Sequence, residues 1–240
     1  MKVLIKKLVR EFLKKLNLKL SYYDRSRPRY IKAVESLGIN LVFDIGANQG
    51  QFALSLLEHD YSGRIVSFEP TNNVYKKLQY NAKKFQNWII HERTAVGDKS
   101  GETKINVAGN EAASSSILAM GKTHEESAPE ANYIGFENVK LIAIDDIFED
   151  YYVEGNKCLL KIDVQGYEEQ VLMGAMSTLS KVNAVKLECA LVSLYEGDKT
   201  YEHYFTFFED NGFELYDMEA GFSNPKTGKL LQFDAFFVRT

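Results

Sequence analysis

The sequence predicts an α/β fold with a doubly wound, mostly parallel sheet. Apolar strand segments alternate with helical segments from about residue 41 to the C-terminus, which is the pattern of such a sheet. Two early strands end in acids, Asp44 and Glu69, and the first runs into a turn with Gly46 and Gly50. Because the carboxyl ends of parallel strands meet at one edge of a sheet, we expect a ligand site there.

The predicted elements follow one another with short connections. We expect strands near residues 41–45, 64–69, 88–92, 103–108, 139–143, 158–163, 184–190, 213–218 and 232–239. We expect helices near residues 50–59, 72–85, 167–176 and 199–211. Asn211 and Gly212 form a helix stop, and residues 225–228 supply a turn for a final hairpin.

The residue types at the first two strand ends indicate a ligand that contains a nucleoside. Gly46 and Gly50 allow a tight bend and a close approach of the backbone to a ligand. Glu69 offers two acceptor oxygens and no donor, which suits the vicinal diol of a ribose. Asp44 is placed to attract the positive end of a ligand rather than a phosphate.

The glycine spacing disfavours a nicotinamide dinucleotide. A dinucleotide turn has the pattern Gly-x-Gly-x-x-Gly, whose amides face a pyrophosphate. Here Asn48 stands where the second glycine of that pattern would be. The spacing of Asp44, Gly46, Asn48 and Gly50 instead resembles the first motif of class I S-adenosylmethionine-dependent methyltransferases, in a variant with asparagine in the middle.

Several further segments resemble the FkbM family of methyltransferases, in the same order along the chain. They are residues 43–50 (FDIGANQG), 67–70 (SFEP), 95–98 (AVGD), 114–116 (SSS), 159–175 (LLKIDVQGYEEQVLMGA), 186–188 (KLE) and 233–239 (FDAFFVR). The resemblance covers the chain from about residue 40 onward. It implies a Rossmann-like class I methyltransferase fold, with a mostly parallel seven-stranded sheet and an antiparallel last strand.

The resemblance also implies S-adenosylmethionine as the methyl donor and, most often, a hydroxyl acceptor on a sugar or natural product. It assigns the cofactor site to Asp44, Gly46, Asn48, Gly50, Glu69, Thr94 and Ala95. Thr94 and Ala95 are expected beside the adenine. Gln51 either caps the following helix or reaches the methionyl carboxylate.

Methyl transfer to a hydroxyl needs the acceptor held in line and a base for its proton. Asp163 is our first candidate for the base because it ends a strand at the same sheet edge as Asp44 and Glu69. Glu188, near the end of the next strand, is the second, ahead of His91 and His203. Alternatively, Asp163 binds the methionyl amine of the cofactor, and Glu188 only bonds backbone amides or Lys161.

Two further features bear on the site. Asp163 and Glu188 raise the hypothesis of a Mg²⁺ site, but two acids without a third ligand do not define one, and we predict no metal. The long polar segment 109–132 is expected to form a wall or lid of the acceptor site. The alternative is a surface insertion without a function.

Composition sets outer limits on function. The chain has 240 residues, a net charge of −4 and a pI near 5.7. This charge gives no support for the general basic surface that binds nucleic acid. Cys158 and Cys189 fall in neighbouring predicted strands, and we expect buried free thiols and a cytoplasmic protein. We leave the oligomeric state open.

The first residues predict a basic amphipathic helix. Residues 1–16 place apolar side chains at helical spacing, with lysine and arginine in most other positions. We predict two parts, residues 1–37 with this helix and a connector, and the methyltransferase domain at 38–240. We expect the helix to pack on protein; peripheral contact of residues 1–20 with the inner face of a membrane is the alternative.

Two other classes of protein compete with a methyltransferase. A noncatalytic binding module of the same fold would be expected to have lost the acids or glycines of the cofactor site, yet all of them are present. An NAD-dependent oxidoreductase fits the glycine spacing less well. Binding of S-adenosylmethionine or of NAD separates these classes.

Overall fold

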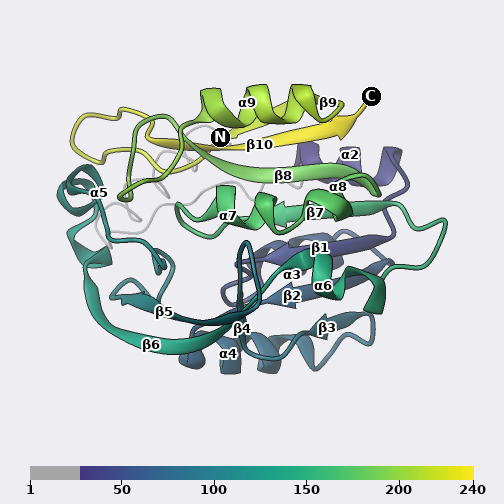
Figure 1. Ribbon diagram of the computed structural model, residues 1–240, viewed down its shortest axis with the longest axis horizontal. Helices are drawn as coiled ribbons and strands as arrows, with labels where there is room; N and C mark the ends of the chain where they lie inside the picture. The colour runs from purple at the N-terminus through teal and green to yellow at the C-terminus, as the bar shows by residue number, and fades with distance from the viewer. Residues whose placement is uncertain (1–27) are drawn as a thin grey trace, which may run out of the picture.

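The computed structural model describes residues 28–240 and contains a seven-stranded sheet in the order β3-β2-β1-β7-β8-β10-β9 (Figure 1). Its strands are β1 (Leu41–Ile45), β2 (Arg64–Phe68), β3 (Trp88–Ile90), β7 (Cys158–Ile162), β8 (Val182–Ala190), β9 (Phe213–Ala220) and β10 (Gln232–Arg239). In this sheet β10 alone runs in the direction opposite to the other six strands, and it is antiparallel to both β8 and β9. The predicted fold class is therefore confirmed.

Helices cover both faces of this sheet. The helices of the described part of the chain are α2 (Arg29–Ser36), α3 (Gln51–Leu57), α4 (Asn72–Ala82), α5 (Lys122–Ser127), α6 (Ile144–Ile147), α7 (Glu168–Met173), α8 (Met176–Leu179) and α9 (Tyr201–Asp210), with 3-10 turns at Pro129–Ala131 and Phe148–Asp150. The buried residues of α2, α3 and α4 pack on one face, and those of α6 to α9 pack on the other. The central strands are thus buried on both sides, which explains their nearly continuous apolar runs.

Phe43 of β1 illustrates how the core is built. Its side chain is fully buried and stacks on Phe68, at 6.2 Å between ring centroids, and on Phe148, at 5.2 Å. The preceding residue, Val42, belongs to the cluster on the opposite face of the sheet. Alternate residues of a single strand therefore anchor both layers of helices.

A second sheet forms outside the main one. It holds β4 (Thr94–Val96), β6 (Tyr133–Ile142) and β5 (Gly101–Ala108), with β6 in the middle. The predicted strands near 103–108 and 139–143 belong to this small sheet. The segment 109–132, expected as a long loop, contains α5 and a 3-10 turn and is tied down by backbone bonds from Ser116 to Asn106 and from Gly121 to Leu194.

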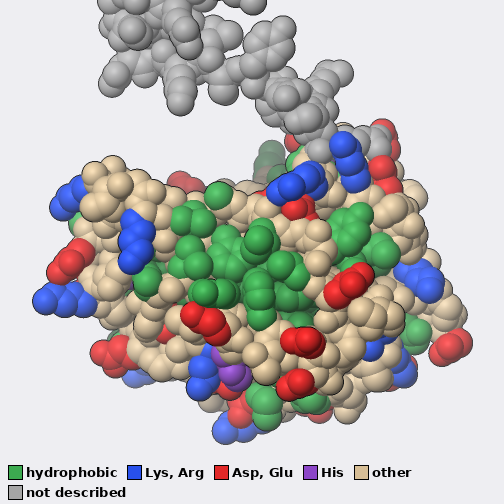
Figure 2. Space-filling model, turned by 90° about the horizontal axis from the view of Figure 1, so that it is seen from above, with side chains coloured by type: hydrophobic (Ala, Val, Ile, Leu, Met, Phe, Trp, Pro, Cys, Tyr) green, Lys and Arg blue, Asp and Glu red, His purple; other side chains and the backbone are tan. Residues whose placement is uncertain are grey.

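The edge strand β9 carries exposed apolar side chains. Figure 2 looks onto the side of the molecule that holds β9 and α9, and hydrophobic side chains gather near its centre. Leu215, Tyr216 and Met218 of β9 are each more than a third exposed. Apolar surface of this kind is typical of a contact site.

Two expectations concern residues away from the sheet edge. Cys158 and Cys189 are both free and buried, as predicted. The predicted basic helix over residues 1–16 lies outside the described residues. Within residues 28–240, no helix is long and apolar enough to cross a membrane.

We expect Phe43→Ala to lower the free energy of unfolding by about 3–5 kcal/mol, because it opens a cavity between three packed rings. Urea denaturation followed by circular dichroism measures this loss. Phe136→Ala is the matched control, since Phe136 is 60% exposed, and it is expected to cost less than about 1 kcal/mol. Equal losses in both variants would contradict this account of the core.

Candidate functional site

The turn after β1 requires glycine at position 46 because another loop passes directly over it. Gly46 has a φ of +73°, and a Cβ built on it would lie 1.8 Å from the backbone oxygen of Asp163. The amides of Gly46 and Ala47 both donate to the carbonyl of Phe68, at 3.1 and 2.9 Å. The turn is therefore clamped between the end of β2 and the loop after β7.

Asn48 explains how this turn works without its middle glycine. Its φ is +48°, in the left-handed region that asparagine tolerates better than most residues. Its side-chain oxygen accepts hydrogen bonds from the Gln49 amide and from Gln51 Nε2, at 2.8 and 3.1 Å. Its own amide donates to Glu69 Oε2 at 3.0 Å, so Asn48 fixes the acid that ends β2.

Glu69 is buried, and its carboxylate accepts three hydrogen bonds from neighbouring residues. Oε1 accepts hydrogen bonds from the amide and the hydroxyl of Thr71, while Oε2 accepts one from Asn48. Burial raises the pKa of Glu69, and the bonds from Thr71 and Asn48 oppose that rise. Because a carboxylate has about four acceptor positions, the described residues leave one position, on Oε2, for a ligand hydroxyl.

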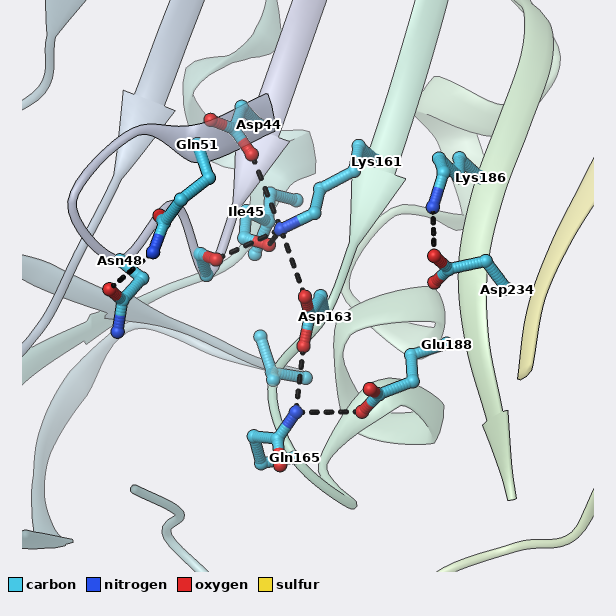
Figure 3. A network of polar contacts seen from close by, with 12 residues as sticks. Asp44, Ile45, Asn48, Gln51, Lys161, Asp163, Gln165, Lys186, Glu188 and Asp234 are labelled. Carbon is cyan, nitrogen blue, oxygen red and sulfur yellow. Dashed lines mark hydrogen bonds and ion pairs between the residues drawn. The ribbon is translucent and has the colours of Figure 1, made fainter. Parts of the chain in front are cut away.

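A buried lysine joins the first turn to the loop after β7. The ammonium of Lys161 lies 3.3 Å from Asp44 Oδ1 and 3.4 Å from Asp163 Oδ2, and it donates to the carbonyl of Gly46 at 2.9 Å. Figure 3 shows this ammonium pointing into the space between the two aspartates. Burial alone would lower the pKa of Lys161, but the Asp163 and Asp44 carboxylates outweigh it and raise the pKa above its usual value. Lys161 is therefore charged at neutral pH.

The loop after β7 holds Asp163 through two side chains that follow it. Gln165 Nε2 donates to Asp163 Oδ1 at 2.8 Å. Glu168 Oε1 accepts the amides of Val164 and Gly166, at 3.0 and 3.2 Å, and so closes the loop from the start of α7. Burial is the main cause that raises the pKa of Glu168 to about 7.

Glu188 lies beside this loop and is held by two side-chain amides. Gln165 Nε2 donates to Glu188 Oε2 at 2.7 Å (Figure 3), and Gln232 Nε2 donates to the same oxygen at 2.9 Å. Burial raises the pKa of Glu188 well above its ordinary value, and the charge of Asp163 adds to that effect. The partners are thus side chains, in place of the backbone amides or Lys161 that the sequence suggested.

One cavity of about 510 Å³ opens among these elements. The predicted site residues that line it are Gly46, Asn48, Glu69, Thr94, Ala95 and Asp163. Gln51 lines it too, as do Ala112, Ala113, Ser115 and Ile117 of the 109–132 segment. The structure therefore brings together most of the residues that the sequence assigned to the site.

The other predicted residues do not line this cavity. Asp44 lies behind the wall, fully buried, and accepts a hydrogen bond from Ser67 at 2.9 Å besides its contact with Lys161. A Cβ on Gly50 would lie 2.3 Å from the Trp88 ring, so packing on β3 requires this glycine. Glu188 is likewise absent from the lining.

Neither histidine considered as a base lies on the cavity wall. The His91 ring bonds the hydroxyl of Tyr151, at 2.8 Å. His203 lies 3.4 Å from Glu169, on the exposed side of α9. Within residues 28–240, no three side chains of His, Cys, Asp or Glu gather as a metal site.

The cavity fits a cofactor that contains a nucleoside. Gly46 and Asn48 form one wall of the cavity, and Glu69 retains an acceptor position. The hydroxyl of Thr94 is buried and has no hydrogen-bond partner within the described part of the chain. Ala95 and Ile105 belong to a small apolar cluster that suits a flat heterocycle.

The sequence did not reveal the contacts by which three residues hold the site together, although it suggested Lys161 as a partner of Glu188. Lys161 contacts Asp44 and Asp163, and Gln165 contacts Asp163. Glu168 accepts a hydrogen bond from the loop after β7. A signal for Lys161 was available, because a lysine inside the apolar strand 158–162 must find a charged partner. The other two depend on the shape of the loop.

The chain matches a known protein family and two related proteins. Residues 44–215 match the family described as Methyltransferase FkbM domain. Hexuronic acid methyltransferase AglP of Haloferax volcanii is 26% identical over 149 residues, which cover 62% of this chain and 55% of AglP. 2-O-methyltransferase NoeI of Sinorhizobium fredii is 24% identical over 162 residues, which cover 65% of this chain and 66% of NoeI.

The matches differ in how much they cover. This chain spans about half of AglP and just under two thirds of NoeI. The crystal structure of TehB from Haemophilus influenzae superposes with a TM-score of 0.50 and 12% identity, over 96% of this chain and 66% of TehB. At this identity the likeness concerns the fold alone.

We expect Lys161→Met to lower the free energy of unfolding by about 3–5 kcal/mol, because it leaves the buried Asp44 carboxylate without its cation. Urea denaturation measures the loss. The double variant Asp44→Asn with Lys161→Met removes both charges and is expected to recover part of it. A double variant no more stable than Lys161→Met would contradict a charge-pairing role.

The raised pKa of Glu168 predicts a pH effect on stability. In the unfolded chain this group titrates near 4.3, so the folded state binds the extra proton between about pH 4.3 and 7. Its contribution to stability is complete below that range and is lost as the pH rises through 7, by on the order of 3 kcal/mol. Glu168→Gln should remove this contribution and gain stability relative to the wild type between pH 5 and 8.

Urea denaturation at pH 5, 6.5 and 8 tests this expectation. Glu102→Gln is the control, because Glu102 is exposed on β5. Its stability difference from the wild type should not change with pH. A Glu168→Gln variant with the same flat difference would show that Glu168 does not carry the effect.

Proposed function

This chain belongs to the FkbM methyltransferase family, and we propose that it transfers a methyl group from S-adenosylmethionine to a hydroxyl group of a sugar. Family membership confirms the predicted family and cofactor. One observation carries the proposal: the first turn, Glu69, Thr94 and Asp163 all line a single cavity. Residues suited to a nucleoside and a carboxylate suited to a reacting hydroxyl therefore share one space.

In this proposal, some residues of the cavity bind the cofactor and others accept or position the proton. S-adenosylmethionine supplies an activated methyl group. Glu69 and Thr94 would hold its nucleoside beside the cavity wall that Gly46 lines. Asp163 accepts the proton of the acceptor hydroxyl, whose oxygen must be held within about 3–3.5 Å of the methyl carbon. Lys161 and Gln165 hold the Asp163 carboxylate in place.

We infer the class of methyl acceptor from the names of the related proteins. AglP is named for a hexuronic acid, and NoeI is named as a 2-O-methyltransferase. A hydroxyl of a sugar or glycan agrees with both names. The 109–132 segment supports such a site, because four of its residues line the cavity, and we propose that it forms part of the acceptor wall.

We also propose that the enzyme works in the cytoplasm, where the buried free thiols of Cys158 and Cys189 remain reduced. The division into residues 1–37 and a methyltransferase domain at 38–240 belongs to the same proposal. Contact of residues 1–20 with an anionic membrane is the alternative to packing on protein. Liposome co-sedimentation of the full chain and of a chain without residues 1–20 distinguishes them.

Asp163→Asn is expected to lower kcat about 10²- to 10⁴-fold, because the amide cannot accept the proton. A radiolabelled methyl group from S-adenosylmethionine, followed into a panel of sugars and glycans, measures turnover. Asp210→Asn, at an exposed position of α9, is the matched control and should keep full activity. Full turnover of Asp163→Asn would exclude Asp163 as the base.

Calorimetry separates this role from the alternative ones. If Asp163 serves only the methionyl amine, the Asn variant should bind S-adenosylmethionine more weakly and turn over normally once saturated. The wild type is expected to bind S-adenosylmethionine and not NAD. Binding of NAD alone would favour an oxidoreductase, and cofactor binding without transfer to any acceptor would favour a noncatalytic module.

A further inference from the structure

Part of the cavity wall comes from elements that lie outside the glycine-bearing turn. Tyr30 belongs to α2, Phe52 to α3, Lys186 to β8 and Asp234 to β10. Lys186 is the register partner of Lys161 in the neighbouring strand, so the two lysines lie in one row across the sheet. The cofactor assignment uses none of these four residues.

Lys186 and Asp234 form a close, mostly buried ion pair. Lys186 Nζ lies 2.5 Å from Asp234 Oδ2, and the lysine side chain is only 9% exposed. Figure 3 shows the two side chains pointing toward each other from adjacent strands. The Asp234 side chain keeps 35% of its surface exposed, and no described residue donates a hydrogen bond to its Oδ1. One acceptor atom of this pair is therefore available to a ligand.

Two aromatic rings lie next to this pair. Tyr30 and Phe52 have ring centroids 5.5 Å apart, and Lys186 Nζ lies 5.7 Å from the centre of the Tyr30 ring. The Tyr30 hydroxyl is already bonded to Ser55 Oγ at 2.7 Å. The rings thus contribute apolar surface beside a charged donor and acceptor, which suits a sugar ring with C–H groups on its face and hydroxyls on its rim.

The charges of the cavity disfavour an acidic ligand at this wall. Four carboxylates line the cavity, Glu69, Asp163, Glu219 and Asp234, against the two ammonium groups of Lys161 and Lys186. Both ammonium groups are already paired with aspartates. A ligand carboxylate would find no unpaired cation among the described lining residues and would meet like charge instead.

We propose that Tyr30, Phe52, Lys186 and Asp234 form the acceptor subsite and that it selects a neutral hexose ring over a uronic acid. Asp234 Oδ1 accepts a sugar hydroxyl, Lys186 donates to a sugar oxygen, and the two rings cover one face of the sugar. This inference rests on the proposed methyl transfer. It separates this chain from AglP, which is named for a hexuronic acid.

A matched pair of acceptors tests the selectivity. Methyl α-glucopyranoside and methyl α-glucopyranosiduronate differ only in the carboxylate at C6. Transfer of labelled methyl from S-adenosylmethionine gives kcat/KM for each. The neutral glycoside is expected to be preferred at least about tenfold, equivalent to about 1.4 kcal/mol. Equal use of the two, or preference for the uronate, would overturn the proposal.

Asp234→Asn links the selectivity to the ion pair. The variant removes one carboxylate and leaves the Lys186 ammonium unpaired, so the preference for the neutral glycoside should fall at least about tenfold or invert. Calorimetry should give a dissociation constant for S-adenosylmethionine within about twofold of the wild type. Asp210→Asn is the control and should keep the wild-type ratio. An unchanged ratio in Asp234→Asn would overturn the proposal.

Phe52→Ala provides an independent variant if Asp234→Asn does not fold. It removes apolar surface without changing charge, so KM for both glycosides should rise about five- to tenfold while their ratio stays constant. An unchanged KM would contradict a subsite at this wall. Failure of the wild type to bind S-adenosylmethionine would instead refute the proposed function.

If neither glycoside is methylated, saturation-transfer NMR with S-adenosylhomocysteine present measures binding directly. Binding of the neutral glycoside alone, weakened about five- to tenfold in Phe52→Ala, supports the subsite. Binding of neither glycoside overturns it.

Discussion

The site depends on the buried ammonium of Lys161. This group touches Asp44 at the end of β1, Asp163 after β7 and the carbonyl of Gly46 in the first turn. An ammonium and two carboxylates are costly to remove from water, and their attraction compensates only when the geometry is tight. Adjacent strands supply that geometry, because Asp44 and Lys161 are register partners in parallel β1 and β7. The ion cluster therefore fixes how the two loops that carry the site lie relative to each other.

The loops then constrain each other through contacts that allow little variation. Gly46 has no side chain because the Asp163 carbonyl occupies the place of a Cβ. Asn48 donates to Glu69, and Glu168 accepts two amides of the loop after β7. Each of these bonds satisfies a buried polar group that would otherwise destabilise the fold. Binding residues held in this way need little rearrangement when a ligand arrives, so less of the binding free energy is lost.

The sequence predicted what is encoded locally. The strand at 232–239, the turn at 44–50 and the acid at 69 each follow from a short run of residues. The structure contains the strand and the turn and places Glu69 on the cavity wall, whereas Asp44 and Gly50 of the turn lie off that wall. Short helices such as α6 and α8, of four residues each, carry too little periodicity to be recognised. Placement of Gly50 against Trp88, and of Glu188 between two glutamines, depends on residues distant in the sequence. The part of the cavity wall formed by the first turn and Glu69 could therefore be predicted, whereas the part formed by Lys186 and Asp234, which come from separate strands, could not.

The sharing of Lys161 between two carboxylates also bears on proton transfer. A base paired with a single buried lysine would leave that cation uncompensated after taking up a proton, which is costly because the Lys161 side chain is only 8% exposed. Here Asp44 Oδ1 stays 3.3 Å from the ammonium and is held by Ser67 on its other oxygen. The Asp163 carboxylate can therefore become neutral while Lys161 keeps a partner. In the proposed reaction, Asp44, which does not line the cavity, would therefore stabilise the charge that remains when Asp163 has accepted its proton.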